Sequence, residues 1–288
     1  MSIVITGASG HLGRLVVEQL VAAGVPAGQI VATGRDTDKL TDLSSNGIAV
    51  RRADFADPHT LSDAFTGADT LLLVSTTDVG QRFDNHRNAI DAAREAGVSL
   101  IVYTSTLNAA TARMRLADEH RRTEEYLRAS GLPFVILRNG WYLENYTDQL
   151  ATIRQQHMLP GSARDGLVSA ASRRDYAAAA VAALTGGDHA GATYELGGPA
   201  FTLTELAATF SEVLGTEVSY LDLPVRKYTE LLISVGLPAE LAAVLADADD
   251  GLARGELYTD SADLQTLIGR PATTRWEAVG DAVAKSDA

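Results

Sequence analysis

The sequence predicts an α/β fold built on a doubly wound parallel sheet, and three observations support this prediction. Short apolar, β-branched runs recur through the first half of the chain. Amphipathic segments of helical length separate these runs, as right-handed β-α-β units require. A glycine-rich turn stands between the first run and the first helical segment. The chain has 288 residues, 46% of them hydrophobic and 21% charged, so it can bury the core of such a fold without a disulfide or a metal.

Six strands and five helices are expected in the first half. The runs are apolar throughout, which suits strands covered on both faces of a parallel sheet. The expected strands are residues 3–6, 30–33, 48–50, 70–74, 100–103 and 134–137. The expected helices are residues 12–23, 38–45, 61–65, 83–96 and 115–129. This alternation is typical of a Rossmann-type sheet.

After Arg138 the alternation of strands and helices becomes less regular, because glycines and prolines interrupt the pattern. Helices are still expected at residues 175–184, 203–214 and 238–246, and strands near 193–196 and 218–221. We therefore expect a Rossmann domain at residues 1–138. Residues 139–288 form a smaller C-terminal substrate lobe in this prediction, with some elements returning to the sheet.

Composition excludes several classes of function. The chain contains no cysteine, so disulfides, thiolate nucleophiles and cysteine-ligated metals are excluded, and no metal site is expected. The net charge of −13 disfavours nucleic acid as a partner. No apolar run is long enough to insert into a membrane, and the N-terminus does not resemble a signal peptide. A cytoplasmic protein is expected, and a homo-oligomer is compatible with the sequence.

The glycine-rich turn predicts a dinucleotide site. It contains Gly7, Ala8, Ser9, Gly10, His11, Leu12 and Gly13, with the spacing G-x-x-G-x-x-G. Gly7 permits the tight turn, Gly10 lets the backbone approach a pyrophosphate, and Gly13 lets the helix pack closely. The helix N-terminus then offers N–H groups and a positive dipole end to the anion. A plain turn is the alternative, but the flanking strand and helix favour the dinucleotide.

The end of the second expected strand suggests which dinucleotide binds. An NAD-selective enzyme usually has a carboxylate there for the ribose 2′-hydroxyl. This chain has Arg35, whose planar guanidinium suits a 2′-phosphate. Arg35 as a solvated residue and Asp36 as the ribose ligand remain alternatives. The sequence favours NADP(H), with NADPH preferred over NADH.

The absence of a Tyr-x-x-x-Lys motif disfavours some reactions. Mainstream short-chain dehydrogenases use a Tyr-x-x-x-Lys pair to donate a proton to a carbonyl, and no tyrosine here has lysine four residues on. The lysines are Lys39, Lys227 and Lys285, none of them in the helix after the fifth strand. Acceptors that need no strong acid are therefore favoured. A quinone is one, because hydride addition gives a stabilised hydroquinone anion, and a carbocation dye is another.

Several segments resemble the NmrA-like, atypical branch of the short-chain dehydrogenase superfamily. Within it the chain is similar to bacterial type 2 NAD(P)H:quinone oxidoreductases and, next, to triphenylmethane dye reductases. The segments that carry the likeness are residues 5–13, 80–82 with 86–88, 103–105, 116–120, 137–146, 174–180 and 234–238. The matches at 116–120 and 138–146 are specific, whereas the glycine turn is shared with the whole superfamily.

The resemblance implies two-electron reduction of a quinone by NADPH. It assigns cofactor binding to residues 7–12 and to Arg35. It also places Ser75, Thr76 and Thr77 under the nicotinamide ribose. Further cofactor-side residues, facing the nicotinamide and the acceptor, are Asn139, Gly140, Trp141 and Tyr142. Trp141, Tyr142 and Tyr146 are candidate planes for stacking a flat quinone, with packing between lobes as the alternative.

His120 and Tyr142 are the candidate catalytic residues. Alignment of the helix at 115–129 with mainstream relatives puts Leu116 in the tyrosine position and His120 in the lysine position. A histidine there can protonate the reduced acceptor or bind the ribose. The alternative is a surface histidine beside Glu124.

Three other functions compete with quinone reduction. One is reduction of a cationic dye or an enone on the same fold. Another is a redox sensor or regulator that binds NADP(H) without turnover. The third, an epimerase or dehydratase of a nucleotide sugar, is disfavoured by the missing Tyr-Lys pair.

Overall fold

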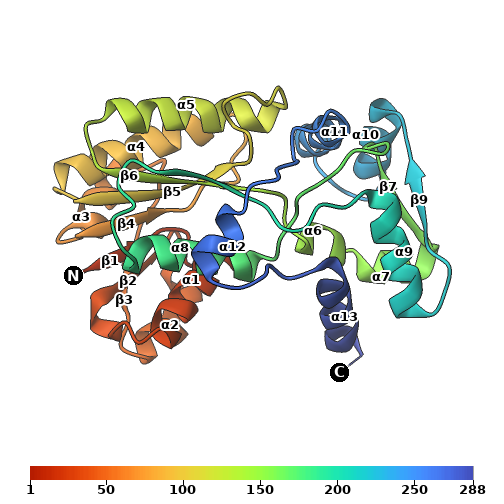
Figure 1. Cartoon of the computed structure of the whole chain (residues 1–288). Helices are drawn as coiled ribbons and strands as arrows, with labels where there is room; N and C mark the ends of the chain where they lie inside the picture. Colours follow the sequence, from red (N-terminus) through yellow and green to blue (C-terminus); the bar gives the residue numbers. More distant parts are fainter. Residues whose placement is uncertain (288) are drawn as a thin grey trace. The chain divides into compact units, whose positions relative to one another are not determined.

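The fold is built around a seven-stranded sheet (Figure 1). The computed structural model describes residues 1–287. The strand order is β3-β2-β1-β4-β5-β6-β8. Its strands are β1 (Ile3–Ile5), β2 (Ile30–Gly34), β3 (Ala49–Arg52), β4 (Thr70–Leu73), β5 (Leu100–Thr106), β6 (Phe134–Asn139) and β8 (Thr193–Leu196). The pairs from β3 to β5 are parallel, with Ile5 opposite Ala32 on one side and Leu72 on the other. The order reverses between β1 and β4, so the predicted Rossmann-type sheet is confirmed.

Helices cover both faces of this sheet. On one face α1 (His11–Ala22) packs against α8 (Arg173–Thr185), and the Gln19 side-chain amide donates to the Arg174 carbonyl at 2.9 Å. The other face carries α3 (Pro58–Phe65), α4 (Arg82–Glu95) and α5 (Arg115–Ala129) (Figure 1). The connection from β2 to β3 contains two short 3₁₀ and α segments, η2 (Thr37–Leu40) and α2 (Thr41–Ser45), and η1 (Ala27–Gln29) precedes β2.

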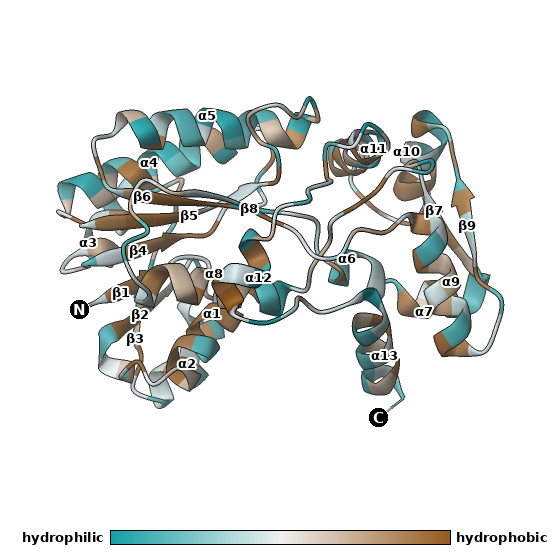
Figure 2. Cartoon of the chain, viewed as in Figure 1, coloured by the Kyte–Doolittle hydropathy of each residue, from teal (hydrophilic) through white to brown (hydrophobic). Residues whose placement is uncertain are grey.

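The central strands are apolar because neither face meets water. Every residue of β1 and β4 is buried. Val4, Leu71, Ile101 and Ile136 contribute to one core beneath α3 and α4. Figure 2 shows the corresponding hydrophobic strands under helices whose outer faces are hydrophilic. Burial on both faces accounts for the continuous apolar runs from which these strands were predicted.

The chain divides into two compact units that interleave along the sequence. The first unit comprises Met1–Ser105, Glu119–Arg138 and Arg173–Tyr194. The second comprises Thr106–Asp118, Asn139–Ser172 and the residues from Glu195 onward. The division predicted after residue 138 coincides with one of the crossings between units, and the two contiguous domains stay a prediction.

The second unit has its own small sheet and core. Strand β7 (Met158–Gly161) pairs in parallel with β9 (Ser219–Asp222). Tyr146, Phe201 and Phe210 lie in the core of this unit. Its helices are α6 (Glu144–Thr147), α7 (Leu150–Gln156), α9 (Leu203–Leu214), α10 (Val225–Ser234), α11 (Ala239–Ala253), α12 (Asp263–Ile268) and α13 (Arg275–Ser286).

The sequence prediction was less complete in the second half. Strand β7 was not predicted, because Pro160 and Gly161 were interpreted as breaks in the pattern. A proline is tolerated in a two-stranded sheet, where one edge of each strand needs no ladder partner. The sequence prediction also missed helices α6, α7, α10, α12 and α13, and α11 continues to Ala253, beyond the predicted end at residue 246.

Candidate functional site

The glycine loop connects the end of β1 to the start of α1, as predicted. Gly7 has φ +60°, the left-handed conformation that favours glycine. The Ala8 N–H donates to the Thr33 carbonyl of β2 at 2.9 Å, which ties the loop to the next strand. A Cβ on Gly13 would lie 2.4 Å from the Gly7 carbonyl oxygen. At this position α1 therefore approaches the loop too closely for any residue other than glycine. The conformational roles predicted for Gly7 and Gly13 are confirmed.

The N-terminus of α1 is suited to an anion. Gly10 is the N-cap, no side chain caps this end, and the first turn contains no acidic residue. The first N–H groups of a helix lack intrahelical acceptors, and the helix dipole adds positive potential there. Ser9, Gly10 and His11 are exposed at this end, whereas Ala8 and Leu12 are buried. The loop therefore presents backbone donors on a rigid support, which is the arrangement that a pyrophosphate needs.

Arg35 follows directly after β2 and is 69% exposed. Its Nη1 lies 3.8 Å from Oδ2 of Asp78, in the loop after β4. Asp36 is used locally, because its Oδ1 accepts the Asp38 N–H at 3.1 Å and caps a 3₁₀ turn. The Arg35 guanidinium is thus an exposed cation at the end of β2, held by a long ion pair with Asp78.

The loop after β4 contains Ser75, Thr76 and Thr77, and its backbone is held by side chains from the turn after β1, from β5 and from α4. The N–H of Val74 donates to Thr6 Oγ1, and that of Ser75 donates to Thr104 Oγ1, both at 2.9 Å. The N–H of Thr76 donates to His86 Nε2 at 3.1 Å. The loop lies beside the topological switch point between β1 and β4, where ligands bind in this fold.

The segment from Asn139 to Tyr142 lies in the second unit. The Gly140 N–H donates to the Leu196 carbonyl at 2.8 Å, and the Trp141 carbonyl accepts the Ala171 N–H at 3.1 Å. Asn139 is buried, and within residues 1–287 its Oδ1 has no hydrogen-bond partner. Tyr142 forms an isolated bridge with Ala171. The roles predicted for these residues toward a cofactor or an acceptor stay predictions.

Two of the aromatic side chains proposed to stack a quinone pack within the second unit. Trp141 packs against the core of this unit. Tyr146 is buried, and its ring meets the Phe201 ring edge-on with centroids 6.4 Å apart. These contacts lie within one unit, so both stacking on a quinone and packing between lobes stay predictions for Trp141 and Tyr146.

His120 lies on α5 and is 4% exposed, so the alternative of a surface histidine is wrong. Its Nδ1 lies 2.7 Å from the Tyr103 hydroxyl. Burial, together with nearby Arg82 and His86, holds the pKa of His120 well below its ordinary value. Glu124 is occupied elsewhere, by Ser105 Oγ at 2.6 Å and by Arg138. A part for His120 in proton transfer stays a prediction.

Comparison with known proteins identifies the family. Residues 7–186 match the family described as NAD(P)H-binding, a match that spans the glycine loop, Arg35 and the loop after β4. The chain belongs to this NAD(P)H-binding family. The predicted cofactor class is thereby confirmed.

Relatives within the family resemble the whole chain. It is 46% identical over 278 residues to Quinone oxidoreductase 2 of Escherichia coli (strain K12), covering 96% of this chain and 97% of the relative. The crystal structure of NADPH-dependent quinone oxidoreductase QOR2 from E. coli, complexed with NADPH, superimposes with a TM-score of 0.94 over 97% of this chain and 99% of that one. The Citrobacter sp. triphenylmethane reductase complexed with NADP(H) is 35% identical, with a TM-score of 0.91 over 98% of this chain and 100% of that one. The predicted resemblance is confirmed.

A cluster of buried polar side chains surrounds His120, and apart from His120 its members were not assigned a role from the sequence. Arg82 and His86 of α4 are buried with Tyr103, His120 and Thr123. The sequence contained one signal that these side chains are buried, namely their helical spacing. Arg82 and His86 share a helical face with the buried Ala89, Ile90 and Ala93. Polar side chains on an apolar helical face need internal partners, and these partners lie on β5 and α5, far away in the sequence.

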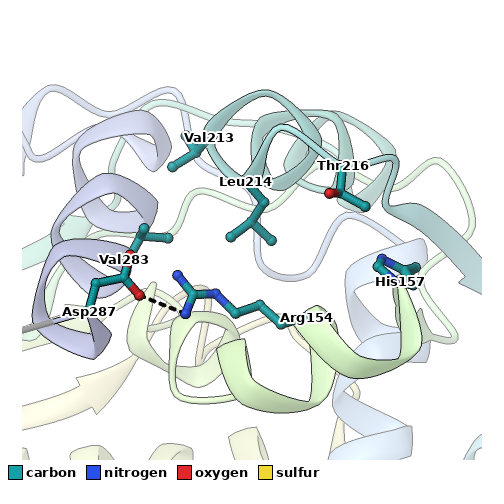
Figure 3. Close-up of a pocket in the computed structure, with 7 residues that line it drawn as sticks. All are labelled: Arg154, His157, Val213, Leu214, Thr216, Val283 and Asp287. Atoms are coloured by element: carbon teal, nitrogen blue, oxygen red, sulfur yellow. Dashed lines mark hydrogen bonds and ion pairs between the residues drawn. The ribbon is translucent and has the colours of Figure 1, made fainter.

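Other site types find no support in the described chain. Residues 1–287 contain no cluster of three or more histidine, aspartate or glutamate side chains able to hold a metal ion. Within the same residues no helix is both long and apolar enough to cross a membrane. A surface hollow of the second unit lies between α7, α9 and α13, where Arg154 and Asp287 pair at 2.8 Å beside Val213, Leu214 and Val283 (Figure 3). None of the predicted site residues lines this hollow.

Proposed function

We propose that the protein is an NADPH-dependent oxidoreductase that transfers a hydride to a quinone. The observation that carries this proposal is the 46% identity to E. coli Quinone oxidoreductase 2 over nearly the full length of both chains. The structure of a relative solved with NADPH supports the choice of reductant. In the overall reaction, NADPH delivers a hydride, one proton comes from water, and the quinone becomes a hydroquinone.

The fit of the cofactor to this chain rests on its own backbone. The close approach at Gly13 and the uncapped start of α1 form a cradle for a pyrophosphate. In this proposal residues 7–12 hold the pyrophosphate and Arg35 holds the 2′-phosphate. The loop of Ser75, Thr76 and Thr77 supports the nicotinamide ribose. The bound cofactor supplies the hydride, and these residues orient it.

The missing Tyr-x-x-x-Lys pair is compatible with this reaction. Hydride addition to a quinone gives an anion whose charge spreads over an aromatic ring, so a positioned acid adds little. Catalysis then depends on holding donor and acceptor in the reactive geometry. Asn139, Gly140, Trp141 and Tyr142 stay the proposed acceptor-side residues.

The test is oxidation of NADPH and of NADH, followed at 340 nm, with a menadione-type quinone as acceptor. We expect turnover with NADPH and a higher KM with NADH. Cofactor binding without turnover on any acceptor would instead support a redox-sensing function. Failure of both cofactors to reduce the quinone would overturn the proposal.

Replacing Arg35 with alanine tests the cofactor preference. We expect the KM for NADPH to rise about tenfold, because charge-assisted hydrogen bonds to the 2′-phosphate are lost. The KM for NADH, which lacks that phosphate, should stay within about twofold. Arg226→Ala, at an exposed arginine of α10, is the matched control. Equal loss with both cofactors would show that Arg35 does not read the 2′-phosphate.

A cationic dye is the second candidate acceptor, favoured by the 35% identity to triphenylmethane reductase. A carbocation accepts hydride to give a neutral product and also needs no proton donor. A panel of quinones, enones and triphenylmethane dyes at fixed NADPH separates the candidates. A kcat/KM for a dye above those for all quinones would assign the enzyme to dye reduction.

A further inference from the structure

Thr76 has both of its backbone polar groups bound by buried side chains of α4. Its N–H donates to His86 Nε2 at 3.1 Å, and its carbonyl accepts from Arg82 Nε at 2.8 Å. Arg82 and His86 belong to segments that carry the family resemblance, yet the proposed function gives neither residue a role. Their contacts fix the peptide groups on both sides of the Thr76 Cα.

The acceptor role of His86 fixes its protonation. A backbone N–H only donates, so Nε2 must carry a lone pair and the ring proton lies on Nδ1. Nδ1 lies 3.1 Å from Thr123 Oγ1, which itself donates to the Glu119 carbonyl at 2.8 Å and can therefore accept the ring proton. Burial, and secondarily the charge of Arg82, lowers the pKa of His86 to about 3, so the imidazole is neutral at pH 7.

The side chain of Tyr103 holds His86 in place. The Tyr103 hydroxyl lies 3.4 Å from His86 Nδ1 and 2.7 Å from His120 Nδ1. The rings of His86 and Tyr103 meet edge-on, with centroids 5.3 Å apart. These contacts leave the imidazole little freedom to turn away from Thr76.

Arg82 is anchored by Glu119 of α5. Arg82 is 5% exposed, and its Nη1 lies 3.1 Å from Glu119 Oε2. Glu119 also accepts the backbone N–H of Arg82 at 3.0 Å and that of Gly80 at 3.3 Å. One carboxylate thus fixes both the start of α4 and the guanidinium that binds the Thr76 carbonyl.

We propose that His86 is a positioning residue, whose neutral Nε2 sets the Thr76 backbone and thereby the support for the nicotinamide half of the cofactor. Arg82, anchored by Glu119, holds the next peptide group through the Thr76 carbonyl. The inference rests on the proposed function, because that proposal places residues 75–77 at the nicotinamide ribose. In this inference the buried side chains of His86, Tyr103 and His120 act together to position Thr76. None of them needs to transfer a proton to the substrate.

Two polar variants separate positioning from bulk packing. In His86→Gln the side-chain amide reaches the former Nε2 position and offers an oxygen to Thr76. In His86→Asn the shorter amide reaches only the former Nδ1 position, beside Thr123. Dissociation constants are measured for NADPH and for 2′,5′-ADP, a probe that lacks the nicotinamide half.

We expect His86→Asn to raise the Kd for NADPH about tenfold and to leave the Kd for 2′,5′-ADP within about twofold. His86→Gln should restore the NADPH Kd to within about threefold of the parent. Hydrogen exchange at the Thr76 amide should be fast in the asparagine variant and protected in the glutamine variant. The same two substitutions at the exposed His59 of α3 are the matched controls and should change none of these values.

Equal NADPH affinities in the two His86 variants would overturn the inference, as would equal losses for NADPH and 2′,5′-ADP in His86→Asn. Neither result depends on the acceptor. NADPH binding without quinone turnover in the parent protein would count against the proposed function alone.

Discussion

A Gly13→Ala variant is expected to lose about a hundredfold in NADPH affinity, together with about 1–3 kcal/mol of stability. The added Cβ would lie 2.4 Å from the Gly7 carbonyl oxygen and 2.7 Å from the Gly7 carbonyl carbon. Both atoms are backbone, so α1 or the loop itself must move. Such a shift misplaces the N–H groups at the start of α1, on which the proposed pyrophosphate site depends. Fluorescence titration with NADPH and urea unfolding measure the two losses.

Two other glycines serve as comparisons for the Gly13→Ala variant. A Cβ on Gly10 would lie 3.3 Å from the Gly7 carbonyl oxygen, so Gly10→Ala should have a smaller effect on folding. A Cβ on Gly28 would meet no atom within 4 Å, so Gly28→Ala should leave affinity and stability unchanged. If Gly13→Ala bound NADPH as tightly as Gly28→Ala, the glycine loop would not be the pyrophosphate site.

Most of the first unit could be predicted from the sequence, because its determinants are local. Strands β1 and β4 are buried on both faces, so their apolar runs reveal them directly. Gly7 adopts a left-handed conformation, and Gly13 lies where a Cβ would meet the backbone of the loop. The glycine motif in the sequence predicts both features. Arg35 was identifiable because the end of β2 has a fixed relation to the glycine loop.

Features that depend on contacts between distant segments could not be predicted. Thr76 and Arg82 are near neighbours in the chain, but Glu119, which anchors Arg82, lies on α5. The burial of His120 depends on Tyr103 and His86, so the sequence left a surface position open as an alternative. The short strand β7 exists only because β9 pairs with it, and no local signal marks it.

Asp249 is expected to make the stability of the protein depend strongly on pH. It lies on α11 and is 7% exposed, and its Oδ2 accepts the Ser162 N–H at 2.9 Å. Burial raises the pKa of Asp249 from its ordinary value of 3.8 to about 7; the Ser162 hydrogen bond opposes this rise and the charge of Asp222 adds to it. Burial, and secondarily the charge of Asp249, also raises the pKa values of the Tyr146 and Tyr228 hydroxyls.

The direction of the effect follows from which state binds the proton more tightly. The folded state holds the proton of Asp249 up to about pH 7, whereas the unfolded chain releases it near pH 3.8. Its contribution to stability is therefore complete below pH 3.8 and is lost as the pH rises through about 7. A shift of about three pKa units corresponds to about 4 kcal/mol.

Asp249→Asn removes this dependence, because the amide stays neutral and keeps an oxygen for Ser162. Relative to the parent, the variant should gain up to about 4 kcal/mol in unfolding free energy between pH 4 and pH 8. Urea unfolding of both proteins across this range gives the difference, in which the titration of all other groups cancels. Asp281→Asn, on the exposed side of α13, is the matched control and should show no such trend. A difference between Asp249→Asn and the parent that stays constant with pH would mean that Asp249 is ionised in the folded protein, and that the core of the second unit accommodates a buried charge.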